Sequence, residues 1–560
     1  MDVLRLLRTL WYVPPQALAW RLWARLKRQY YTLPMYGVRG VWQSQGLQPP
    51  LKWVGIEIVP GNALRGNALA DGRWLLAGQD LPLGVPPRSW LPARAQALQH
   101  FEMHYHEWLA DLRAADRPET ARKLVADWLL QFAHYHPTAW HPYPTSLRIA
   151  AWLTYGGWLL AEAEDDFREA YHVALHAQLN YLRHNCEWDL GGNHLIKNLK
   201  ALLLGALARE DGAALLWAEG ALINALRHQI LPDGAHDERT PHYHAQVLQD
   251  ILEIRAALRA SGHSGGGVWD TWIAQMAQAL AFYTYPDGRL GLWNDGVEGD
   301  ASRLATLLGY GGNAPAPSCL KAAGYARLQA GKGKRVLGVM FDAGKVGPDE
   351  NPGHAHADTL AFELWLGTER VVVNQGTLAY QHPLRHALRS TAAHSTLQLE
   401  GTESAEVWGG HRVGRRPKYV VLEEREPGRV VAGSHDGYRH MGLTHKRVLQ
   451  LEDAPEVALQ GHDFLSGPLL NGVRQHQRVW VRFHLHPKVQ VRQLNEQQAE
   501  LTLPSGATLQ FACTGGRLTV QPSRYAGQWN VLTPTQQLAV RVQQPEVSWR
   551  FSLKAPNGGR

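Results

Sequence analysis

Two histidines and an aspartate are closely spaced in residues 351–359, and their side chains could carry protons or bind a metal ion. His354 and His356 are two residues apart, and Asp358 follows two residues later. The next run, residues 360–366, alternates in hydrophobicity, which predicts a strand. If the extended backbone continues back through the motif, its period of two places all three side chains on one face. A solvated strand start with surface histidines is the alternative interpretation.

A second group of polar residues follows the glycine pair at residues 191–192. Asn193 and His194 come at the predicted start of a helix, and Lys197 lies one turn further along. An asparagine at this position is most often an N-cap. A cap needs only the asparagine, however, and the two cations add donors at the positive end of the helix dipole. This arrangement suits the binding of a carboxylate.

A third group is concentrated in residues 231–244, just before and at the start of another predicted helix. A tyrosine beside an arginine and histidines can have its pKa lowered from about 10, which makes it usable as a base. The alternative is a surface helix start with the tyrosine packed inward. The titratable residues of this segment are Asp233, His236, Asp237, Glu238, Arg239, His242, Tyr243 and His244.

Two further polar residues stand at the ends of predicted strands. His394 lies in residues 389–396, and Asn374 begins residues 374–377. Together with His356 they could surround a metal ion, with two imidazoles and one oxygen as ligands and an open position. Histidines held by structural hydrogen bonds are the competing interpretation.

The elements that position these groups change type near residue 330. Helical periodicity and short breakers predict antiparallel helix hairpins at 146–161, 166–184, 194–208, 213–230, 242–260 and 268–284. Short alternating runs after residue 331 predict a large antiparallel β-sandwich. We therefore expect an irregular N-terminal segment with a basic amphipathic helix (1–90), an α-helical domain (91–325) and a β-sandwich domain (326–560).

Composition narrows the class of partner. The chain has 560 residues, 45% of them hydrophobic and 19% charged, which is typical of a folded globular protein. A net charge of +7 favours an acidic partner. Because no nucleic-acid-binding module is recognisable, we expect an acidic polysaccharide and no nucleic acid.

The N-terminal residues favour a surface role over a membrane-spanning one. No apolar run is long enough to predict a transmembrane segment, and no secretory signal is recognisable. The segment with Arg21, Arg25, Lys27 and Arg28 predicts a basic amphipathic helix. Such a helix could contact an anionic membrane peripherally, although packing against its own domain is the more common use.

Five short blocks occur in order over roughly residues 100–500. They are Gly-Gly-Asn-His-Leu, Asp-Gly-Ala-His-Asp-Glu-Arg-Thr-Pro-His-Tyr-His, Gly-His-Ala-His-Ala-Asp, Ala-Ala-His-Ser-Thr and Glu-Val-Trp-Gly-Gly. Together they resemble the heparinase II/III-like family of polysaccharide lyases. The resemblance implies an α/α-toroid of helix hairpins followed by an antiparallel β-sandwich, in agreement with the periodicity.

The resemblance also implies roles for single residues. It makes Tyr243 and His354 the acid and base of a β-elimination across a cleft where the toroid meets the sandwich, and Asn193 with His194 the groups that neutralise a uronate carboxylate. We further expect substrate contacts from Arg239, Glu238 and Lys197. A structural zinc, present in some relatives, would be bound by His356 and His394. The third ligand is an aspartate in those relatives, but this chain has Asn374 there, and an amide is a poorer metal ligand than a carboxylate.

Two other functions fit the same sequence. A glycoside hydrolase on the same toroid would use two carboxylates among Asp189, Asp233, Glu238 and Asp295. A non-catalytic protein of exopolysaccharide production would only bind the polymer. The substrate class suggests the bacterial periplasm, whereas the N-terminus has no recognisable signal peptide.

Overall fold

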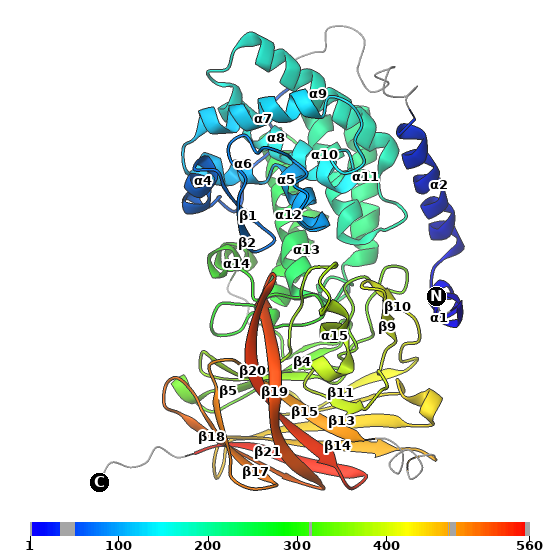
Figure 1. The fold of residues 1–560 in the computed structure, drawn as a ribbon, viewed down its shortest axis with the longest axis vertical. Coiled ribbons are helices and arrows are strands. Elements are labelled where there is room, and N and C mark those ends of the chain that lie inside the picture. The colour runs from blue at the N-terminus through cyan, green and yellow to red at the C-terminus, as the bar shows by residue number, and fades with distance from the viewer. Residues whose placement is uncertain (1–2, 34–50, 313–315, 469, 471–477, 555–560) are drawn as a thin grey trace. The chain divides into compact units, whose positions relative to one another are not determined.

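A computed structural model describes the chain except for residues 1–2, 34–50, 313–315, 469, 471–477 and 555–560 (Figure 1). Contacts within the chain define two compact units. Unit 1 comprises Met1–Tyr12, Ile230–Ala245 and Gln275–Arg560, and unit 2 comprises Val13–Gln229 and Gln246–Ala274. The candidate residues are therefore divided between two units that each contain several separate stretches of chain.

Unit 2 is predominantly helical. Helix α8 packs against α9 and α10, and α10 packs against α11. The buried indoles of Trp128 and Trp152 lie edge to face with ring centroids 5.8 Å apart, which fills the space between α7 and α8. The helices are α2 (Pro15–Tyr31), α4 (Ala63–Ala70), α5 (Ala97–Tyr105), α6 (Trp108–Ala114), α7 (Pro118–Gln131), α8 (Pro142–Leu160), α9 (Asp165–Asn185), α10 (Gly192–Ala208) and α11 (Gly212–Gln229).

Helices α12 (Pro241–Ala260) and α13 (Val268–Tyr283) contribute residues to both units. The six helices predicted from periodicity are confirmed, because each coincides with one of α8 to α13 within a few residues. The first 90 residues contain more regular structure than the irregular segment that we predicted. Besides α1 (Val3–Leu10), α2 and α4, they form a hairpin of β1 (Arg73–Leu76) and β2 (Gln79–Pro82).

Unit 1 contains two large antiparallel sheets. The eight-stranded sheet has the order β11-β12-β13-β14-β21-β18-β17-β16. Its strands are β11 (Val420–Glu426), β12 (Val430–His435), β13 (Thr444–Glu452), β14 (Ala458–Ser466), β16 (Gln490–Gln493), β17 (Gln498–Thr502), β18 (Thr508–Thr514) and β21 (Glu546–Leu553).

The nine-stranded sheet has the order β19-β20-β15-β7-β6-β5-β4-β3, and β8 also pairs with β15. Strands β19 and β20 form the long hairpin drawn in red (Figure 1). The strands are β3 (Cys319–Leu320), β4 (Tyr325–Ala330), β5 (Leu337–Asp342), β6 (Phe362–Leu366), β7 (Glu369–Val373), β8 (Leu397–Leu399), β15 (Val479–Leu485), β19 (Gly516–Gln528) and β20 (Val531–Val542).

One hydrophobic core joins the two sheets into a β-sandwich. Phe483 of β15 and Trp549 of β21 come from different sheets, and their ring centroids lie 4.9 Å apart. As the alternation predicts, Val479, Val481 and Phe483 are all buried. The predicted fold class, helical toroid-type domain plus antiparallel β-sandwich, is therefore confirmed.

The motif at residues 351–359 is not part of a strand, contrary to the continuous pleat considered above. Strand β6 begins only at Phe362. The backbone turns just before it, because the amide of Ala361 donates to the carbonyl of Asp358, and Leu360 adopts a left-handed φ of 66°. The period of two of a strand therefore does not set the directions of His354, His356 and Asp358, although both histidines contact Asp295.

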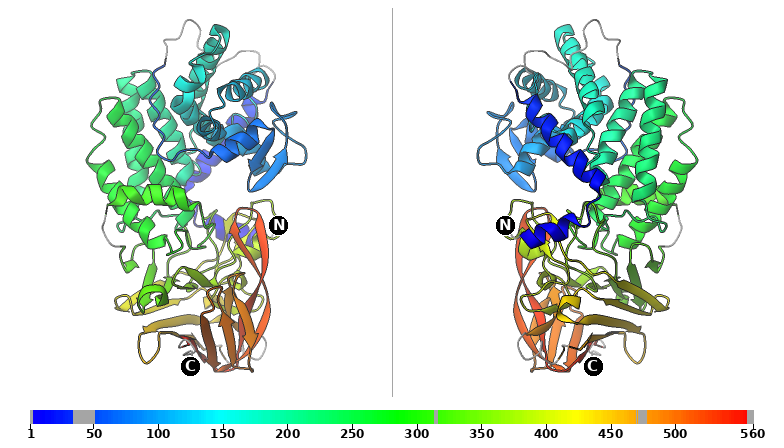
Figure 2. Two further views of the ribbon diagram at one scale, coloured as in Figure 1. Left: turned by 90° about the vertical axis from the view of Figure 1, so that its left-hand side faces the viewer. Right: turned by 90° about the vertical axis from the view of Figure 1, so that its right-hand side faces the viewer.

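Among the described residues, no helix is both long enough and apolar enough to cross a membrane. Helices α1 and α2, in dark blue, are seen clearly when the molecule is turned (Figure 2). Helix α2 is the basic N-terminal helix that the sequence predicts, whereas α1 was not predicted.

Candidate functional site

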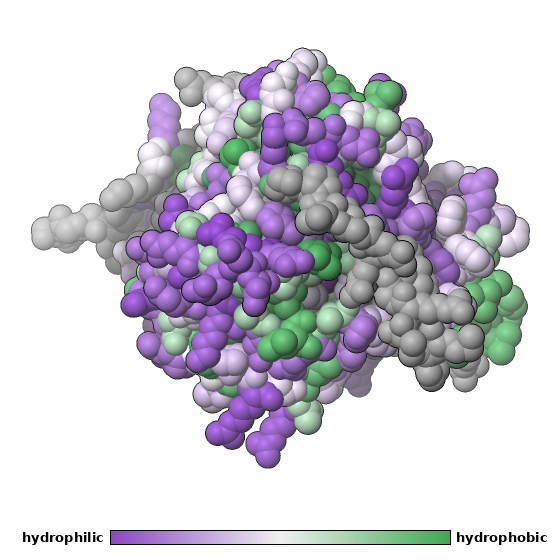
Figure 3. Space-filling view, turned by 90° about the horizontal axis from the view of Figure 1, so that it is seen from above, coloured by the Kyte–Doolittle hydropathy of each residue, from purple (hydrophilic) through white to green (hydrophobic). Residues whose placement is uncertain are grey.

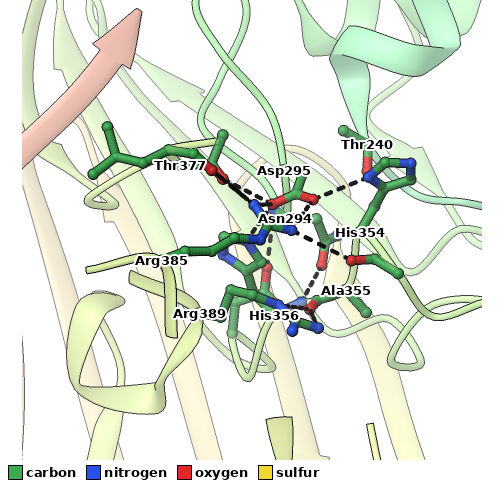
Figure 4. Close-up of polar contacts among 12 residues, drawn as sticks. Thr240, Asn294, Asp295, His354, Ala355, His356, Thr377, Arg385 and Arg389 are labelled. Atoms are coloured by element: carbon green, nitrogen blue, oxygen red, sulfur yellow. Dashed lines mark hydrogen bonds and ion pairs between the residues drawn. The ribbon is translucent and has the colours of Figure 1, made fainter. Parts of the chain in front are cut away.

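A buried carboxylate, Asp295, organises the polar residues of unit 1 (Figure 4). His354 Nδ1 lies 3.0 Å from Asp295 Oδ2, and His356 Nε2 lies 2.9 Å from Oδ1. The hydroxyl of Thr377 donates to Oδ1 at 2.8 Å. Arg385 donates to both oxygens, at 2.9 and 2.6 Å. We call these five residues the Asp295 network.

The Asp295 network keeps its central group ionised. Burial raises the pKa of Asp295, but the Arg385 guanidinium and the two histidine hydrogen bonds outweigh this effect, so that the pKa lies well below its usual range. A carboxylate can only accept hydrogen bonds, so the facing nitrogens of His354 and His356 must carry protons. The network therefore fixes His354 as the Nδ1–H tautomer and directs its Nε2 away from Asp295.

Tyr243 lies directly against His354. The ring centroids are 4.0 Å apart at an interplanar angle of 32°. The two side chains are in contact, as expected, and both belong to unit 1, while their roles as acid and base stay a prediction. Two other groups approach the same imidazole: the hydroxyl of Tyr380 lies 2.9 Å from Nδ1, and Glu238 Oε2 lies 3.6 Å from Nε2. His354 is thus held between a phenol, a second hydroxyl and two carboxylates.

The loop before α12 positions Tyr243 and Glu238. Arg239 adopts a left-handed φ of 52°, and its carbonyl accepts hydrogen bonds from Asn294 Nδ2 and the Tyr325 hydroxyl. Helix α12 begins two residues later at Pro241, whose fixed φ suits a first helical position. The reversal at Arg239 allows Glu238 to approach His354 while Tyr243 emerges from the first turn of the helix.

His244 and His236 are structural residues of the same loop. His244 Nδ1 accepts from the backbone amide of His236, and its Nε2 lies 2.8 Å from the carbonyl of Met276. Burial lowers the pKa of His244 to about 4. Both ring nitrogens are therefore used to fix the loop conformation.

The pair His356 and His394 has the electronic arrangement of two metal ligands. His394 Nδ1 lies 2.8 Å from the carbonyl of Ser390 and must donate to it, just as His356 Nε2 donates to Asp295. Burial lowers the pKa of both imidazoles, that of His356 to about 3. In their neutral forms, His356 Nδ1 and His394 Nε2 then direct lone pairs at each other across 3.1 Å. Such a contact suits a cation between them.

The remaining ligand predicted from the sequence has other partners. Asn374 Oδ1 accepts from the amide of Ser395, and its Nδ2 donates to the carbonyl of Leu292. No group of three or more His, Cys, Asp or Glu side chains with metal-binding geometry occurs within the described parts of the chain. The groups that could bind a metal here are therefore the two imidazoles and the remaining lone pair of Asn374 Oδ1.

Asn193 and His194 lie at the start of α10 in unit 2, as predicted. Gly191 and Gly192 adopt left-handed φ values of 63° and 53°, which explains the glycine pair. His194 Nδ1 lies 3.0 Å from Glu187 Oε1, and its ring centroid lies 4.1 Å from that of Tyr143. Burial raises the pKa of Glu187, but His194, His141 and Asn198 outweigh it and lower the pKa to about 2.

Lys197 lies in a mostly buried ion pair of unit 2. Its Nζ is 2.9 Å from Asp250 Oδ1, and Lys200 Nζ contacts the same oxygen at 2.8 Å. Burial raises the pKa of Asp250, but the two lysines outweigh it and lower the pKa. The predicted substrate contact of Lys197 would therefore compete with this ion pair.

Several residues of these sites were not predicted from the sequence. Asp295 was considered only as a hydrolase carboxylate, and the roles of Arg385, Tyr380 and Glu187 were not anticipated. The one available signal was Trp293-Asn294-Asp295, where two polar residues interrupt an apolar segment. Arg385 and Tyr380 follow no such pattern, because only the fold brings residues 90 positions apart into contact.

Both parts of the chain match models of one family. The heparinase II/III N-terminus model covers residues 93–310, and the heparinase II/III-like C-terminal model covers residues 313–552. The chain therefore belongs to the heparinase II/III family, whose fold is that of polysaccharide lyases.

Two curated proteins are similar in sequence. FtsZ-localized protein C of Caulobacter vibrioides is 28% identical over 453 residues, which are 76% of each chain. A heparin-sulfate lyase of Bacteroides thetaiotaomicron is 22% identical over 205 residues, covering 33% of this chain and 29% of the lyase.

Solved structures share the fold. Heparinase III aligns with a TM-score of 0.70 at 17% identity, covering 96% of this chain and 90% of that one. A mutant heparan sulfate lyase from Pedobacter heparinus aligns with a TM-score of 0.61 at 16% identity, covering 97% and 89%.

Proposed function

We propose that this protein is a polysaccharide lyase that cleaves an acidic, uronate-containing polysaccharide by β-elimination. The observation that supports this proposal best is the pair of adjacent rings of Tyr243 and His354, held by the ionised Asp295. Elimination requires a group that takes a proton from one carbon and a group that protonates the oxygen leaving the neighbouring carbon. The membership of the chain in the heparinase II/III family agrees with this chemistry.

In the proposed mechanism, His354 is the base and Tyr243 is the acid. Asp295 fixes the Nδ1–H tautomer, so Nε2 carries the lone pair that removes the proton from the carbon next to the carboxylate. The phenol of Tyr243 then donates its proton to the departing glycosidic oxygen. Electrons of the broken C–H bond form the new C=C bond, and the electrons of the C–O bond leave with the oxygen.

Neutralising the carboxylate of the sugar is assigned to Asn193 and His194. The proton next to a carboxylate is too weakly acidic to be removed at neutral pH unless the developing negative charge is stabilised. Hydrogen-bond donors at the start of α10 suit that task, because the helix dipole adds to their effect. Glu187 fixes the ring orientation of His194 through Nδ1.

Among the carboxylates of the hydrolase alternative, Asp295 is unsuited to act as the acid. Hydrolysis needs one protonated carboxyl group, but Asp295 has a pKa well below its usual range. Asp233 accepts hydrogen bonds from the amides of Ala235, Ala322 and Ala323 and so serves to hold the backbone. A hydrolase would therefore need an acid other than Asp295.

The test is the ultraviolet absorbance of digests of a panel of uronate polymers, including heparan-type glycosaminoglycans, alginate and bacterial exopolysaccharides. A lyase produces unsaturated ends that absorb, a hydrolase produces new reducing ends without absorbance, and a binding protein produces neither. On a cleaved polymer, we expect Tyr243→Phe and His354→Ala each to lower the rate by about 10²- to 10⁴-fold. Unchanged absorbance in both variants would refute the assignment.

A matched control is available in β14. His462 is a partly exposed histidine that lies 2.9 Å from the hydroxyl of Ser548, and His462→Ala should leave the absorbance rate unchanged. Thermal unfolding of all three variants separates loss of chemistry from loss of fold.

Within the same proposal, one structural zinc ion is bound by His356 and His394, with Asn374 as the oxygen ligand. The facing lone pairs of the two imidazoles support this assignment. Bound zinc would neutralise their electrostatic repulsion and tie the two loops together. Metal analysis of the purified protein should find about one zinc per chain, and His394→Ala should remove it. Absence of zinc from protein purified without chelators would refute the assignment.

A second candidate function is binding without turnover, and α2 suggests a membrane surface as the place. The relative from Caulobacter is named for its localisation with FtsZ and not for an activity. Apolar side chains on α2 are exposed, with 61% for Leu22, 53% for Trp23 and 49% for Leu26. Seen from above, hydrophobic residues, in green, lie among hydrophilic ones, in purple, on the surface (Figure 3).

The cations of α2 are partly used for attachment to unit 2. Arg21 and Lys27 donate to the carbonyls of Asp189 and His184. The exposed apolar residues Leu22 and Leu26 would therefore make the peripheral membrane contact. Cosedimentation with anionic vesicles should weaken for Leu22→Asp and remain unchanged for Leu130→Asp, because Leu130 is an equally apolar and 84% exposed residue of α7. Equal binding of both variants would exclude α2 as the contact.

A further inference from the structure

A pocket of unit 1 with a volume of about 330 Å³ has a basic lining that the proposed mechanism does not use. Besides Arg239, its lining comes from β3 and the turn that follows it, from residues 343–345 after β5, and from β11 of the other sheet. Its charged lining residues are Arg239, Lys321, Lys345 and Glu424. Three cations and one carboxylate give the lining a net charge of +2.

The cations retain unused hydrogen-bond donors. Lys321 and Lys345 are exposed, and neither forms a side-chain hydrogen bond or an ion pair with another described residue. Arg239 donates through Nε to the carbonyl of Ala323 and through one terminal nitrogen to the carbonyl of Asp237. These carbonyls orient the guanidinium without neutralising its charge.

The nearby acidic groups compensate this charge only in part. Glu424 accepts a hydrogen bond from Ser318 at 2.7 Å. Asp233, which precedes this region in the sequence, uses its carboxylate for backbone amides of residues 235, 322 and 323. Burial, together with Glu424, raises the pKa of the Cys319 thiol to about 11, so the thiol adds no negative charge. The pocket therefore has an excess of positive charge over negative charge.

We propose that this pocket binds one oxyanion group, a carboxylate or a sulfate, between Arg239, Lys321 and Lys345. Oxyanions accept several charge-assisted hydrogen bonds at once, and a guanidinium with two ammonium groups supplies them. The group can come from an acidic polysaccharide or from a free anion. The inference rests on the geometry of unit 1 alone and does not require lyase activity.

An anion bound in the pocket would affect the Asp295 network through the backbone of Arg239. The same residue directs its guanidinium to the pocket and its carbonyl to Asn294, while the preceding Glu238 lies 3.6 Å from His354. A bound anion would hold Arg239 in its left-handed conformation and so stabilise the position of Glu238.

The experiment is calorimetric titration of the full chain with sodium sulfate and with a sulfated or uronate oligosaccharide, at ionic strength matched with sodium chloride. The wild-type protein should bind one sulfate. The double variant Lys321→Met/Lys345→Met should bind it about tenfold more weakly or worse, because two charge-assisted contacts are lost. Lys488→Met is the matched control, since Lys488 is an exposed lysine of the same unit outside the pocket.

A variant that should raise sulfate affinity complements the variants that should lower it. Glu424→Gln removes the only carboxylate of the lining but keeps an acceptor for Ser318, so sulfate affinity should increase. Equal sulfate affinity in the wild type, the double variant and Glu424→Gln would overturn the proposal, as would the absence of sulfate binding.

Oligosaccharide binding with the same response to the variants identifies the polymer as the source of the anion. Sulfate binding alone identifies a free anion. A lyase-inactive protein that still binds sulfate would refute the proposed function and leave this site intact.

Discussion

Each compact unit contains a histidine that is held between a tyrosine ring and a buried carboxylate. In unit 1 the ring of His354 lies 4.0 Å from Tyr243 at 32°, and its Nδ1 lies 3.0 Å from Asp295. In unit 2 the ring of His194 lies 4.1 Å from Tyr143, also at 32°, and its Nδ1 lies 3.0 Å from Glu187. The local geometry of the two pairs is nearly the same.

The environments of the two carboxylates differ. Asp295 is paired with the guanidinium of Arg385, which carries a permanent charge. Glu187 is held by neutral Asn198 and by histidines, whose charge depends on pH. The side chain of His354 is 10% exposed and that of His194 is 30% exposed. The histidine–carboxylate contact of unit 1 is therefore fixed by a permanent ion pair. That of unit 2 depends on the protonation of its histidines, and this difference can be tested.

The largest expected difference is in the tyrosines. Tyr243→Phe should lower the lyase rate by about 10²- to 10⁴-fold, because it removes the proposed acid. Tyr143→Phe keeps the ring that packs on His194 and should change the rate by less than about threefold. Initial rates from product absorbance measure both. Similar losses in the two variants would mean that both tyrosines take part in the chemistry and would remove the distinction between the two pairs.

The next largest effect is on stability in unit 1. Asp295→Asn leaves the buried guanidinium of Arg385 without a counter-charge, which should lower the free energy of unfolding by about 3–5 kcal/mol. Urea unfolding measures the change. The double variant Asp295→Asn/Arg385→Met should recover part of the loss, and a double variant as unstable as the single one would show that the ion pair is not the cause.

Glu187 should reveal the pH dependence of the unit 2 pair. Its folded pKa of about 2 lies below the unfolded value of 4.5, so its contribution is present above pH 4.5 and is lost as the pH falls towards 2. The contribution is about 3 kcal/mol in order of magnitude. Urea unfolding between pH 2.5 and 6 should therefore show a smaller pH dependence in Glu187→Gln than in the wild type. Parallel curves would place the acid-sensitive group elsewhere.

The smallest expected effect concerns Thr377. Its hydroxyl donates to Asp295 Oδ1 at 2.8 Å, next to stronger charged partners. Thr377→Val preserves the shape and should cost about 1 kcal/mol of stability. Differential scanning calorimetry measures the shift. A loss as large as that of Asp295→Asn would mean that the hydroxyl, and not Arg385, anchors the carboxylate.

The sequence predicted the fold and the principal pairs because their signals are local. Periodicity places the helices α8 to α13 and the strand β15 within a few residues, since one face of each element is buried. The facing of Tyr243 and His354 and the contact of His356 with His394 were also predicted, through motifs of the family. These predictions needed residue types and spacing but no knowledge of distant contacts.

The rest depends on backbone reversals and on contacts between distant residues. The left-handed Leu360 that ends the motif before β6 carries no sequence signal, because non-glycine residues adopt this conformation only when tertiary contacts impose it. Arg385 and Asp295 are separated by 90 positions, and an arginine or an aspartate in isolation resembles a surface residue. Asn374, predicted as a metal ligand, also bridges the backbone of two loops, a role that residue types and spacing did not indicate.

Helix α1 has a consequence for the order of events during synthesis. Arg8 donates hydrogen bonds to Glu406, a residue 398 positions later in the chain. At about 5–20 residues per second, the ribosome produces Glu406 roughly 20–80 seconds after Arg8. Throughout this interval the nascent helix has neither its acidic anchor nor Trp408, which donates to Thr9. Helix α1 therefore cannot form these native contacts until residues 406–408 have been made, and its leucines are available to chaperones until then.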